Sequence, residues 1–335
     1  MNKNKYLKYR LQTSRITWKI YRWYSTAGKY RIGIGNASTV KKPEMCRGMA
    51  IWPTNICNAG CVFCAKRKLN LKPKIMGMEL FKKAVDQTYK LGIREIGLNP
   101  IIGDVLLDKN IADKIRYAKS REMRVSFFTN GILLSQNDNY RKIIDAGTDE
   151  ITISVGDTDE SYDSKIFGIT RKASRDRWNG IFMLLRYIKN KKVHVEIFLG
   201  FRPIRPPHQI AKTKMLKALR DFPNITIEFM MCYDNWGGAI TQRELSGVMR
   251  LKKGVKKRGV CISLYNVIIL PDGKVRLCGC RIKDKENDEL VIGDITVSDL
   301  EKIIENRKID EIREKFAKGM YPEVCKDCTL FREAK

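Results

Sequence analysis

Three cysteines lie within eight residues, in the segment CNAGCVFC: Cys57, Cys61 and Cys64. A closed tetrahedral zinc site uses four ligands and a disulfide uses two, so three thiols at this spacing suit neither. Each of the four irons of a [4Fe–4S] cluster takes one outside ligand, so three thiolates would leave one iron open to a small molecule. The only histidines are His194 and His208, which poorly supply a mixed cysteine–histidine site. The segment therefore predicts an iron–sulfur cluster with an open position.

Other cysteines lie in two later parts of the chain. Five stand near its end: Cys261, Cys278, Cys280, Cys325 and Cys328. No signal-peptide-like run opens the sequence, so we expect a reducing, cytoplasmic setting in which these spacings indicate metal ligation rather than disulfides. Cys232 ends an apolar run together with Glu228. A thiol there is either a small buried hydrophobe or a hydrogen-atom donor to a substrate radical.

The elements that would position these residues alternate along the chain. Short β-branched runs are followed by stretches of helical periodicity, which predicts parallel strands with right-handed crossovers. Six such strands form an open sheet or an incomplete barrel, and we expect an α/β fold, a partial (β/α)6 TIM-like barrel. The expected strands are 48–54, 94–99, 123–130, 149–155, 193–201 and 224–232, and the expected helices are roughly 78–92, 109–121, 138–146, 173–190 and 208–221.

The phase of the strands indicates which residues face inward. The helix-covered face of each strand must be apolar, so the more polar set of side chains should line the interior. When this inward-facing set is followed to the carboxyl end of each strand, five strands each end in one polar residue. This favours a ligand cavity at the C-terminal end of the barrel, where the active sites of barrel enzymes lie. These residues are Asn99, Asn130, Ser154, Arg202 and Cys232, with Glu228 in phase with the last.

The CNAGCVFC segment, directly after a first barrel strand, resembles the signature of the radical S-adenosylmethionine (radical SAM) superfamily, with an aromatic, Phe63, before the last cysteine. The resemblance implies that SAM chelates the open iron and is split reductively to a 5′-deoxyadenosyl radical, which removes hydrogen from an unactivated carbon. It implies that Gly103 and Asp104 occupy the place of the SAM-binding Gly-Glu turn, although Ile102 and Val105 depart from the pattern. It also implies cofactor contacts for Phe63, Asn130, Ser154 and Arg202.

The spacing from Cys261 through Gly273 to Cys278 resembles the opening of the SPASM and twitch extensions of this superfamily. The resemblance implies one auxiliary [4Fe–4S] cluster held by Cys261, Cys278, Cys325 and Cys328, with Cys280 as an alternative ligand and zinc as the alternative metal. The expected domains are a basic N-terminal helix and linker (1–47), the partial barrel (48–240) and a small iron–sulfur domain (241–335).

Positive charge is concentrated at the N-terminus. The chain carries a net charge of +28, and its first 43 residues hold eleven lysines and arginines and no acid. Residues 3–25 are predicted to form one basic, aromatic-rich helix, which would either pack on the protein body or lie in an anionic membrane interface. No apolar run is long enough to span a membrane. We therefore expect a cytoplasmic protein, with peripheral attachment to a membrane as the open alternative.

Three substrate classes remain open. The first is an anionic or glycan-type small molecule, a carbohydrate or cyclitol (phosphorylated, nucleotide-linked or lipid-linked), which would be oxidised or epimerised at a hydroxyl-bearing carbon. The second is a ribosomal peptide, which the short segment before the first strand disfavours. The third is RNA, indicated only by charge, without a recognisable RNA-binding module. The resemblance further implies a flavodoxin- or ferredoxin-like electron donor.

Overall fold

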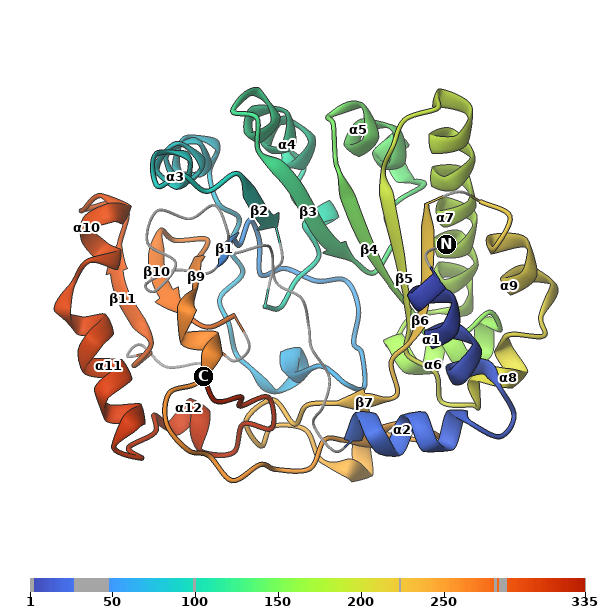
Figure 1. Ribbon diagram of the computed structural model, residues 1–335. Coiled ribbons are helices and arrows are strands. Elements are labelled where there is room, and N and C mark those ends of the chain that lie inside the picture. Colours follow the sequence, from blue (N-terminus) through green and yellow to red (C-terminus); the bar gives the residue numbers. More distant parts are fainter. Residues whose placement is uncertain are drawn as a thin grey trace.

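The computed structural model describes residues 3–26, 48–98, 101–222, 224–279, 282 and 288–334. Its centre is a nine-stranded sheet in which six parallel strands stand in chain order. Because the order never reverses, every crossover places its helix on the same face, and the sheet curls into the expected partial barrel (Figure 1). These strands are β1 (Gly48–Ile51), β2 (Glu95–Leu98), β3 (Arg124–Thr129), β4 (Glu150–Val155), β5 (Glu196–Phe201) and β6 (Ile225–Phe229).

The helices cover the outer face of this sheet (Figure 1). Alternate strand residues such as Ile151, Ile153 and Val155 are fully buried against them, as the strand phases predicted. The helix α6 was not expected from the sequence. The crossover helices are α3 (Met78–Lys90), α4 (Ile111–Ser120), α5 (Asn139–Asp145), α6 (Glu160–Phe167), α7 (Arg171–Lys191), α8 (Pro207–Ile210) and α9 (Lys214–Leu219).

The C-terminal part continues the same sheet. Strand β9 (Asn266–Ile269) pairs in parallel with β1, and β10 (Lys274–Leu277) and β11 (Val291–Asp294) follow in antiparallel order. Strands β9 and β10 form a hairpin that turns at residues 271–273. No break in the sheet marks the expected boundary near residue 240. Two short strands, β7 (Cys232–Tyr233) and β8 (Arg250–Leu251), pair separately, and α10 (Leu300–Ile304), α11 (Arg307–Ala317) and α12 (Glu323–Lys326) complete the chain.

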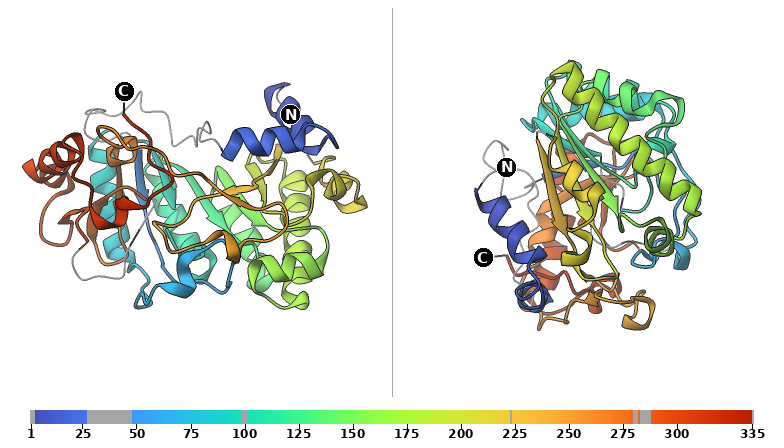
Figure 2. Two further views of the ribbon diagram at one scale, coloured as in Figure 1. Left: turned by 90° about the horizontal axis from the view of Figure 1, so that it is seen from below. Right: turned by 90° about the vertical axis from the view of Figure 1, so that its right-hand side faces the viewer.

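The N-terminal segment forms two helices, α1 (Lys3–Thr13) and α2 (Trp18–Thr26), so the prediction of one helix over residues 3–25 was wrong. The chain turns at Ser14, whose hydroxyl accepts hydrogen bonds from the backbone N–H groups of Ile16 and Thr17 and so starts the second helix. Both helices lie against the β6 end of the barrel (Figure 2). Within the part of the chain that the structure describes, no helix is long and apolar enough to cross a bilayer.

Candidate functional site

The loop that carries Cys57, Cys61 and Cys64 follows β1 and is fixed by the end of α6. The backbone N–H of Gly60 donates to the carbonyl of Phe167 at 2.8 Å, and that of Val62 donates to Ile166 at 3.0 Å. Gly168 ends α6 with a φ of 59°, and a Cβ there would fall 2.6 Å from the carbonyl oxygen of Gly60. Glycine is therefore required at position 168 both by the backbone conformation and by the close approach.

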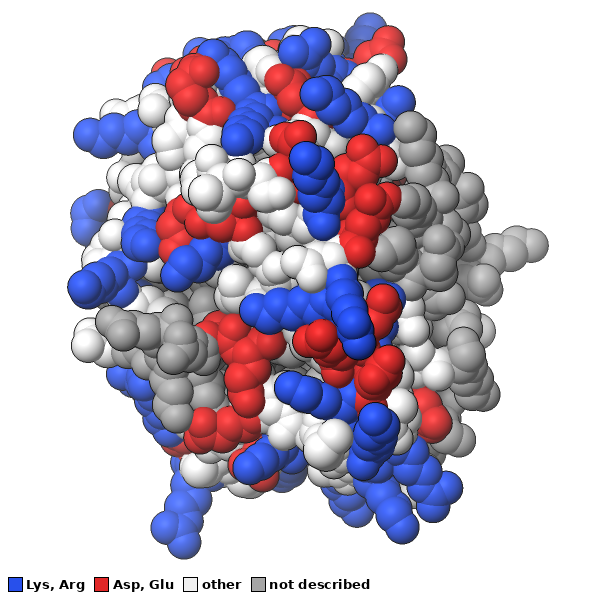
Figure 3. Space-filling model, turned by 90° about the vertical axis from the view of Figure 1, so that its left-hand side faces the viewer, with Lys and Arg blue, Asp and Glu red and all other residues white. Residues whose placement is uncertain are grey.

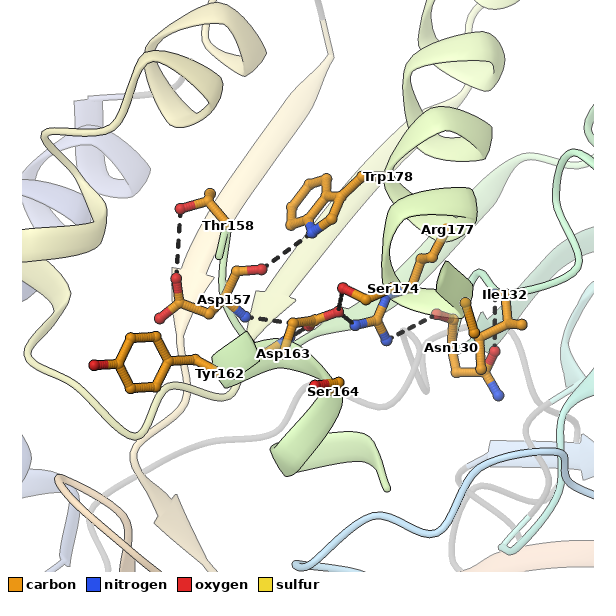
Figure 4. A network of polar contacts seen from close by, with 12 residues as sticks. Asn130, Ile132, Asp157, Thr158, Tyr162, Asp163, Ser164, Ser174, Arg177 and Trp178 are labelled. Atoms are coloured by element: carbon orange, nitrogen blue, oxygen red, sulfur yellow. Dashed lines mark hydrogen bonds and ion pairs between the residues drawn. The ribbon is translucent and has the colours of Figure 1, made fainter. Parts of the chain in front are cut away.

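A buried polar network holds α6 in place (Figure 4). The Asp163 carboxylate pairs with the Arg177 guanidinium, and both side chains are fully buried. The same carboxylate accepts hydrogen bonds from the Ser174 hydroxyl and from the backbone N–H of Gly156. Arg177 lies 4.3 Å from the centre of the Phe167 ring and also donates to the carbonyl of Asn130. The network thus ties α6 and α7 to the end of β3 beneath the cysteine loop.

The surroundings of the three cysteines fit a [4Fe–4S] cluster. Burial raises the pKa of the Cys57, Cys61 and Cys64 thiols, so the thiolates need positive charge, which iron supplies. Apolar side chains cover the loop, and the Lys66 ammonium donates to the carbonyl of Cys57. Among the described residues no three acidic, histidine or cysteine side chains converge tightly enough for a single metal ion. A cluster differs in this respect, because each thiolate binds a separate iron.

Phe63 lies in a box of aromatic and cationic groups. Its ring stacks on Tyr233 with centroids 5.4 Å apart and meets Phe167 edge-on at 5.6 Å. The Arg202 guanidinium lies 4.6 Å from the centre of the Phe63 ring, and the indole N–H of Trp236 donates to the Phe63 carbonyl. Sequence reasoning missed Tyr233 and Trp236. Their only signal was an aromatic cluster directly after the sixth strand.

Arg202 has unused binding capacity. Its Nε is buried and has no hydrogen-bond partner among the described residues. The backbone N–H of Arg202 donates to the carbonyl of Val155, which fixes the residue at the end of β5 beside β4. A buried guanidinium nitrogen is costly without an acceptor, so this position fits the carboxylate of a bound cofactor or substrate. The expected contact of Arg202 with the cofactor remains a prediction.

The Gly103–Asp104 turn lies beside the cysteine loop. The backbone N–H of Asp104 donates to the carbonyl of Ile56 at 2.8 Å, directly before Cys57. The carboxylate of Asp104 is buried, which raises its pKa, and it accepts hydrogen bonds from the Thr129 hydroxyl and from the backbone of Asn130. Asp104 therefore ties the turn to the end of β3, and only the backbone of the turn remains for the expected contact with SAM.

Asn130 and Ser154 stand at the ends of β3 and β4. The side-chain amide of Asn130 donates to the side-chain oxygen of Asn58 at 2.8 Å and lies 3.8 Å from the Cys57 sulfur. Ser154 is half-buried on the inner face and is aligned with Gly200 of β5. Asn130 is thus placed against the cysteine loop and Ser154 in the barrel interior, and their expected contacts with SAM stay predictions. Asn99 lies outside the described residues.

The barrel interior has two layers that the strand register defines. In the lower layer Phe128, Thr152, Phe198 and Thr226 are aligned across β3 to β6. Phe128 remains 44% exposed there, although its neighbours on β3 are buried. The layer nearer the rim contains Ser154, Gly200 and Glu228. Two aromatic rings and two threonines thus lie beneath the Ser154 hydroxyl and the Glu228 carboxylate, and the Met230 sulfur lies 3.2 Å from where a Cβ would stand at Gly200.

Glu228 and Cys232, both predicted to face the interior, differ in their placement. Glu228 is buried and pairs with Lys8 of α1 at 2.5 Å, and burial raises its pKa to about 7. The strand β6 ends at Phe229, and Cys232 belongs to the separate strand β7. The prediction that Cys232 ends the sixth strand was therefore wrong, and its role as a hydrogen-atom donor stays a prediction. Its thiol lies 3.4 Å from the Arg22 carbonyl of α2, and Tyr233 takes the side toward Phe63.

The tail cysteines line one small cavity. Cys261, Cys278, Cys325 and Cys328 surround it together with apolar side chains that include Phe316 and Phe331. Cys278 adopts a left-handed φ of 67°, a strained conformation for a residue with a Cβ. Burial raises the pKa of Cys325 to about 12, so a metal centre would be needed to hold thiolates there. These four residues are the predicted ligands; Cys280 lies outside the described residues.

Comparisons with known proteins agree with both cysteine sites. A family model described as the radical SAM superfamily matches residues 51–225, and an iron–sulfur cluster-binding domain model, SPASM, matches residues 261–329. None of the curated protein sequences compared with the chain matches it.

Solved structures share the fold at low identity. BtrN in complex with AdoMet and 2-DOIA is 16% identical with a TM-score of 0.51, over 84% of this chain and 91% of that one. The anSMEcpe enzyme with AdoMet and the Kp18Cys peptide is 12% identical with a TM-score of 0.51, over 80% and 83%. Streptococcus suis SuiB bound to precursor peptide SuiA is 12% identical with a TM-score of 0.49, over 84% and 69%. By its matches to the two family models the chain belongs to the radical SAM superfamily, and its cofactors are the [4Fe–4S] cluster and SAM of that superfamily together with auxiliary iron–sulfur ligation in a SPASM domain.

Proposed function

We propose that this enzyme oxidises a hydroxyl-bearing carbon of a carbohydrate or cyclitol. The observation that carries the proposal is the layered interior, in which Glu228 and Ser154 lie above the exposed ring of Phe128. Hydroxyl and carboxylate groups bind sugar hydroxyls, and an exposed aromatic ring covers the apolar face of a sugar ring. BtrN, one of the proteins that share this fold, was crystallised with a small molecule.

The blocked edge of β6 supports a small substrate rather than an extended peptide. The side-chain amide of Gln12 accepts from the backbone N–H of Phe229 at 3.1 Å and donates to its carbonyl at 3.0 Å. An extended peptide commonly binds by adding a strand to a free sheet edge. Gln12 occupies the backbone groups that such a peptide would use at this point.

Oxidation is favoured over epimerisation by the placement of Cys232. Inversion of a carbon needs a hydrogen-atom donor in the pocket, and the Cys232 thiol lies against the Arg22 carbonyl of α2. Oxidation needs instead a proton acceptor and an electron acceptor. Burial raises the pKa of Glu228 to about 7, which suits a general base at neutral pH. Epimerisation with Cys232 as donor remains the second candidate.

The proposed oxidation balances as follows. When bound, the cluster and SAM would provide the means to remove one hydrogen atom from the hydroxyl-bearing carbon. That hydrogen atom would be recovered in 5′-deoxyadenosine, and methionine would be released. The hydroxyl proton passes to the Glu228 carboxylate, and the C–O bond becomes a carbonyl. The remaining electron requires an acceptor, a role that we assign to the SPASM cluster site at Cys261, Cys278, Cys325 and Cys328. The first electron comes from a reductant, which we propose is a flavodoxin or ferredoxin.

The test uses reconstituted enzyme with SAM, a reductant and a panel of free and phosphorylated sugars and cyclitols. We expect one of them to stimulate 5′-deoxyadenosine formation and to yield a product lighter by two hydrogens. Glu228→Gln should lower that product at least tenfold, whereas Cys232→Ala should leave it within about twofold. A product that keeps the substrate's mass in H2O and gains one solvent deuterium at the reacting carbon in D2O, and that is lost in Cys232→Ala, would replace oxidation by epimerisation.

Peptide modification is the alternative function, since anSMEcpe was crystallised with a peptide. It is discriminated by the same assay. Stimulation of 5′-deoxyadenosine formation by a peptide and by no sugar or cyclitol would favour it. Modification of RNA would instead require binding that weakens steeply with salt.

A further inference from the structure

Exposed apolar side chains are concentrated on the two N-terminal helices. Among the described residues, six of the twelve large exposed hydrophobic side chains lie between positions 6 and 23. The most exposed are Ile16 at 78%, Trp23 at 69% and Ile20 at 64%. A group of this kind marks an interaction surface, whereas single exposed apolar residues are ordinary.

Helical geometry places these residues away from the protein body. Successive helical residues are about 100° apart, so Ile20 and Trp23 of α2 fall opposite Trp18, and Ile16 is exposed in the turn before that helix. Trp18 is buried in a cluster with Met231 and Val248. Figure 2 shows both helices on the outside of the molecule.

Helix α1 follows the same rule. Its buried face carries Tyr9 and Gln12, which contact the Phe229 ring and backbone. Leu7 and Leu11 project from the opposite face and are exposed. Each helix therefore uses one face to dock on β6 and β7 and presents a second apolar face outward.

The charged side chains of α1 and α2 themselves are all positive. Arg10, Arg15 and Lys19 are exposed between the apolar residues, and the sequence has no acid before Glu44. The opposite end of the molecule differs, because Lys and Arg alternate there with Asp and Glu (Figure 3). A hollow of about 560 Å³ at that end is lined by both signs, including Lys308 and Glu311.

We propose that the outer face of α1 and α2 binds an anionic lipid bilayer. Leucine, isoleucine and tryptophan insert at the boundary between headgroups and acyl chains, and flanking lysine and arginine are attracted to anionic lipid. The positive charge selects a negatively charged occupant. Nucleic acid is a less suitable ligand for this surface. Four of the six exposed apolar residues are aliphatic and offer no ring for base stacking, namely Leu7, Leu11, Ile16 and Ile20.

The surface is connected to the pocket. The Arg22 carbonyl of α2 contacts the Cys232 thiol, and the next residue, Tyr233, stacks on Phe63 beside the cysteine loop. Lys8 of α1 pairs with Glu228 inside the barrel. Bilayer binding would thus hold the β6 side of the pocket near the membrane. The inference goes beyond the proposed function and holds for any substrate.

The test is co-sedimentation of the reconstituted holoenzyme with vesicles. Wild-type protein should bind equimolar phosphatidylcholine–phosphatidylglycerol vesicles, should lose binding in high salt, and should not bind pure phosphatidylcholine. The variant Ile20→Ser/Trp23→Ser and the variant Arg15→Glu/Lys19→Glu should each weaken binding about tenfold or more. Matched controls are Val297→Ser and Lys83→Glu/Lys90→Glu, which are exposed elsewhere and should bind like wild type.

Each alternative outcome is distinct. Wild-type protein that stays in the supernatant with both kinds of vesicle would overturn the proposal. Equal loss of binding in the control variants would overturn it too, because the effect would then be one of total charge. If light scattering shows an oligomer that Ile20→Ser/Trp23→Ser converts to a monomer, and vesicles do not bind, the face joins two copies of the chain. Cleavage of SAM without substrate, measured for each variant, shows that its fold is intact. The membrane proposal can therefore be overturned without affecting the proposed oxidation.

Discussion

At the scale of single residues, the buried pair of Asp163 and Arg177 is the contact on which the cysteine loop depends most. Asp163→Asn leaves the Arg177 charge buried without its counter-ion, and we expect a loss of about 3–5 kcal/mol in the free energy of unfolding. Chemical denaturation measures the change. The control Asp176→Asn removes a solvent-exposed contact with Lys172, 2.7 Å in length, and should cost less than about 1 kcal/mol. Equal effects of the two variants would contradict the structural role of Asp163.

A second prediction at this scale concerns Arg202, whose Nε is buried without a partner among the described residues. Arg202→Gln removes a charge-assisted donor, and we expect the dissociation constant for SAM or substrate to rise about tenfold to a hundredfold. Equilibrium binding of SAM and the KM of the identified substrate distinguish the two ligands. Arg243→Gln, an exposed residue, is the control. Unchanged constants for both ligands would remove Arg202 from the site.

At the scale of elements, the contact between α1 and β6 should respond to pH. Burial raises the pKa of Glu228 from 4.5 to about 7, so the stability that its neutral form contributes is complete below pH 4.5 and is lost as the pH rises through about 7. Relative to Glu228→Gln, the melting temperature of the wild type should therefore fall across this window. If the melting temperatures of the two proteins change in parallel with pH, the ion pair between the Glu228 carboxylate and Lys8 offsets the cost of burying the charge.

Gln12 provides a separate test of the same element. Gln12→Ala leaves the N–H and carbonyl of Phe229 without their side-chain partner, and we expect a loss of about 1–3 kcal/mol and faster amide exchange at the end of β6. Gln136→Ala, at an exposed position, should change the stability by less than about 0.5 kcal/mol. Amide exchange that is unchanged at Phe229 would mean that α1 does not cover this edge in solution.

The elements also show where sequence reasoning succeeds and fails. The strands β1 to β6 were predictable because each repeats an apolar, β-branched pattern before a helical one. Helix α6 was missed although its ends carried signals, the cap Asp159 and the left-handed Gly168. The assignment of Cys232 to the sixth strand was wrong because the apolar run continues to Cys232 although the strand ends at Phe229.

At the scale of the whole molecule, the cysteines predict two iron–sulfur centres. The triad at 57–64 was predictable because its three-then-two spacing is local. The pairing of β9 with β1, which places the tail cysteines on the barrel, is non-local, and no periodicity within either strand encodes it. We expect about eight irons per chain, and about four in Cys325→Ala/Cys328→Ala, with SAM cleavage retained in that variant. About four irons in the wild type would contradict a [4Fe–4S] cluster in the tail.

The most direct test of the proposed oxidation identifies which substrate carbon loses the abstracted hydrogen atom. The reconstituted enzyme is given SAM, a reductant, and sugars or cyclitols carrying deuterium on their hydroxyl-bearing carbons, beside peptides deuterated at the α-carbons. We expect deuterium from one sugar or cyclitol in 5′-deoxyadenosine, together with a carbonyl product, and no transfer in Cys57→Ala. Transfer from a peptide and from none of the sugars or cyclitols would contradict oxidation of a hydroxyl-bearing carbon.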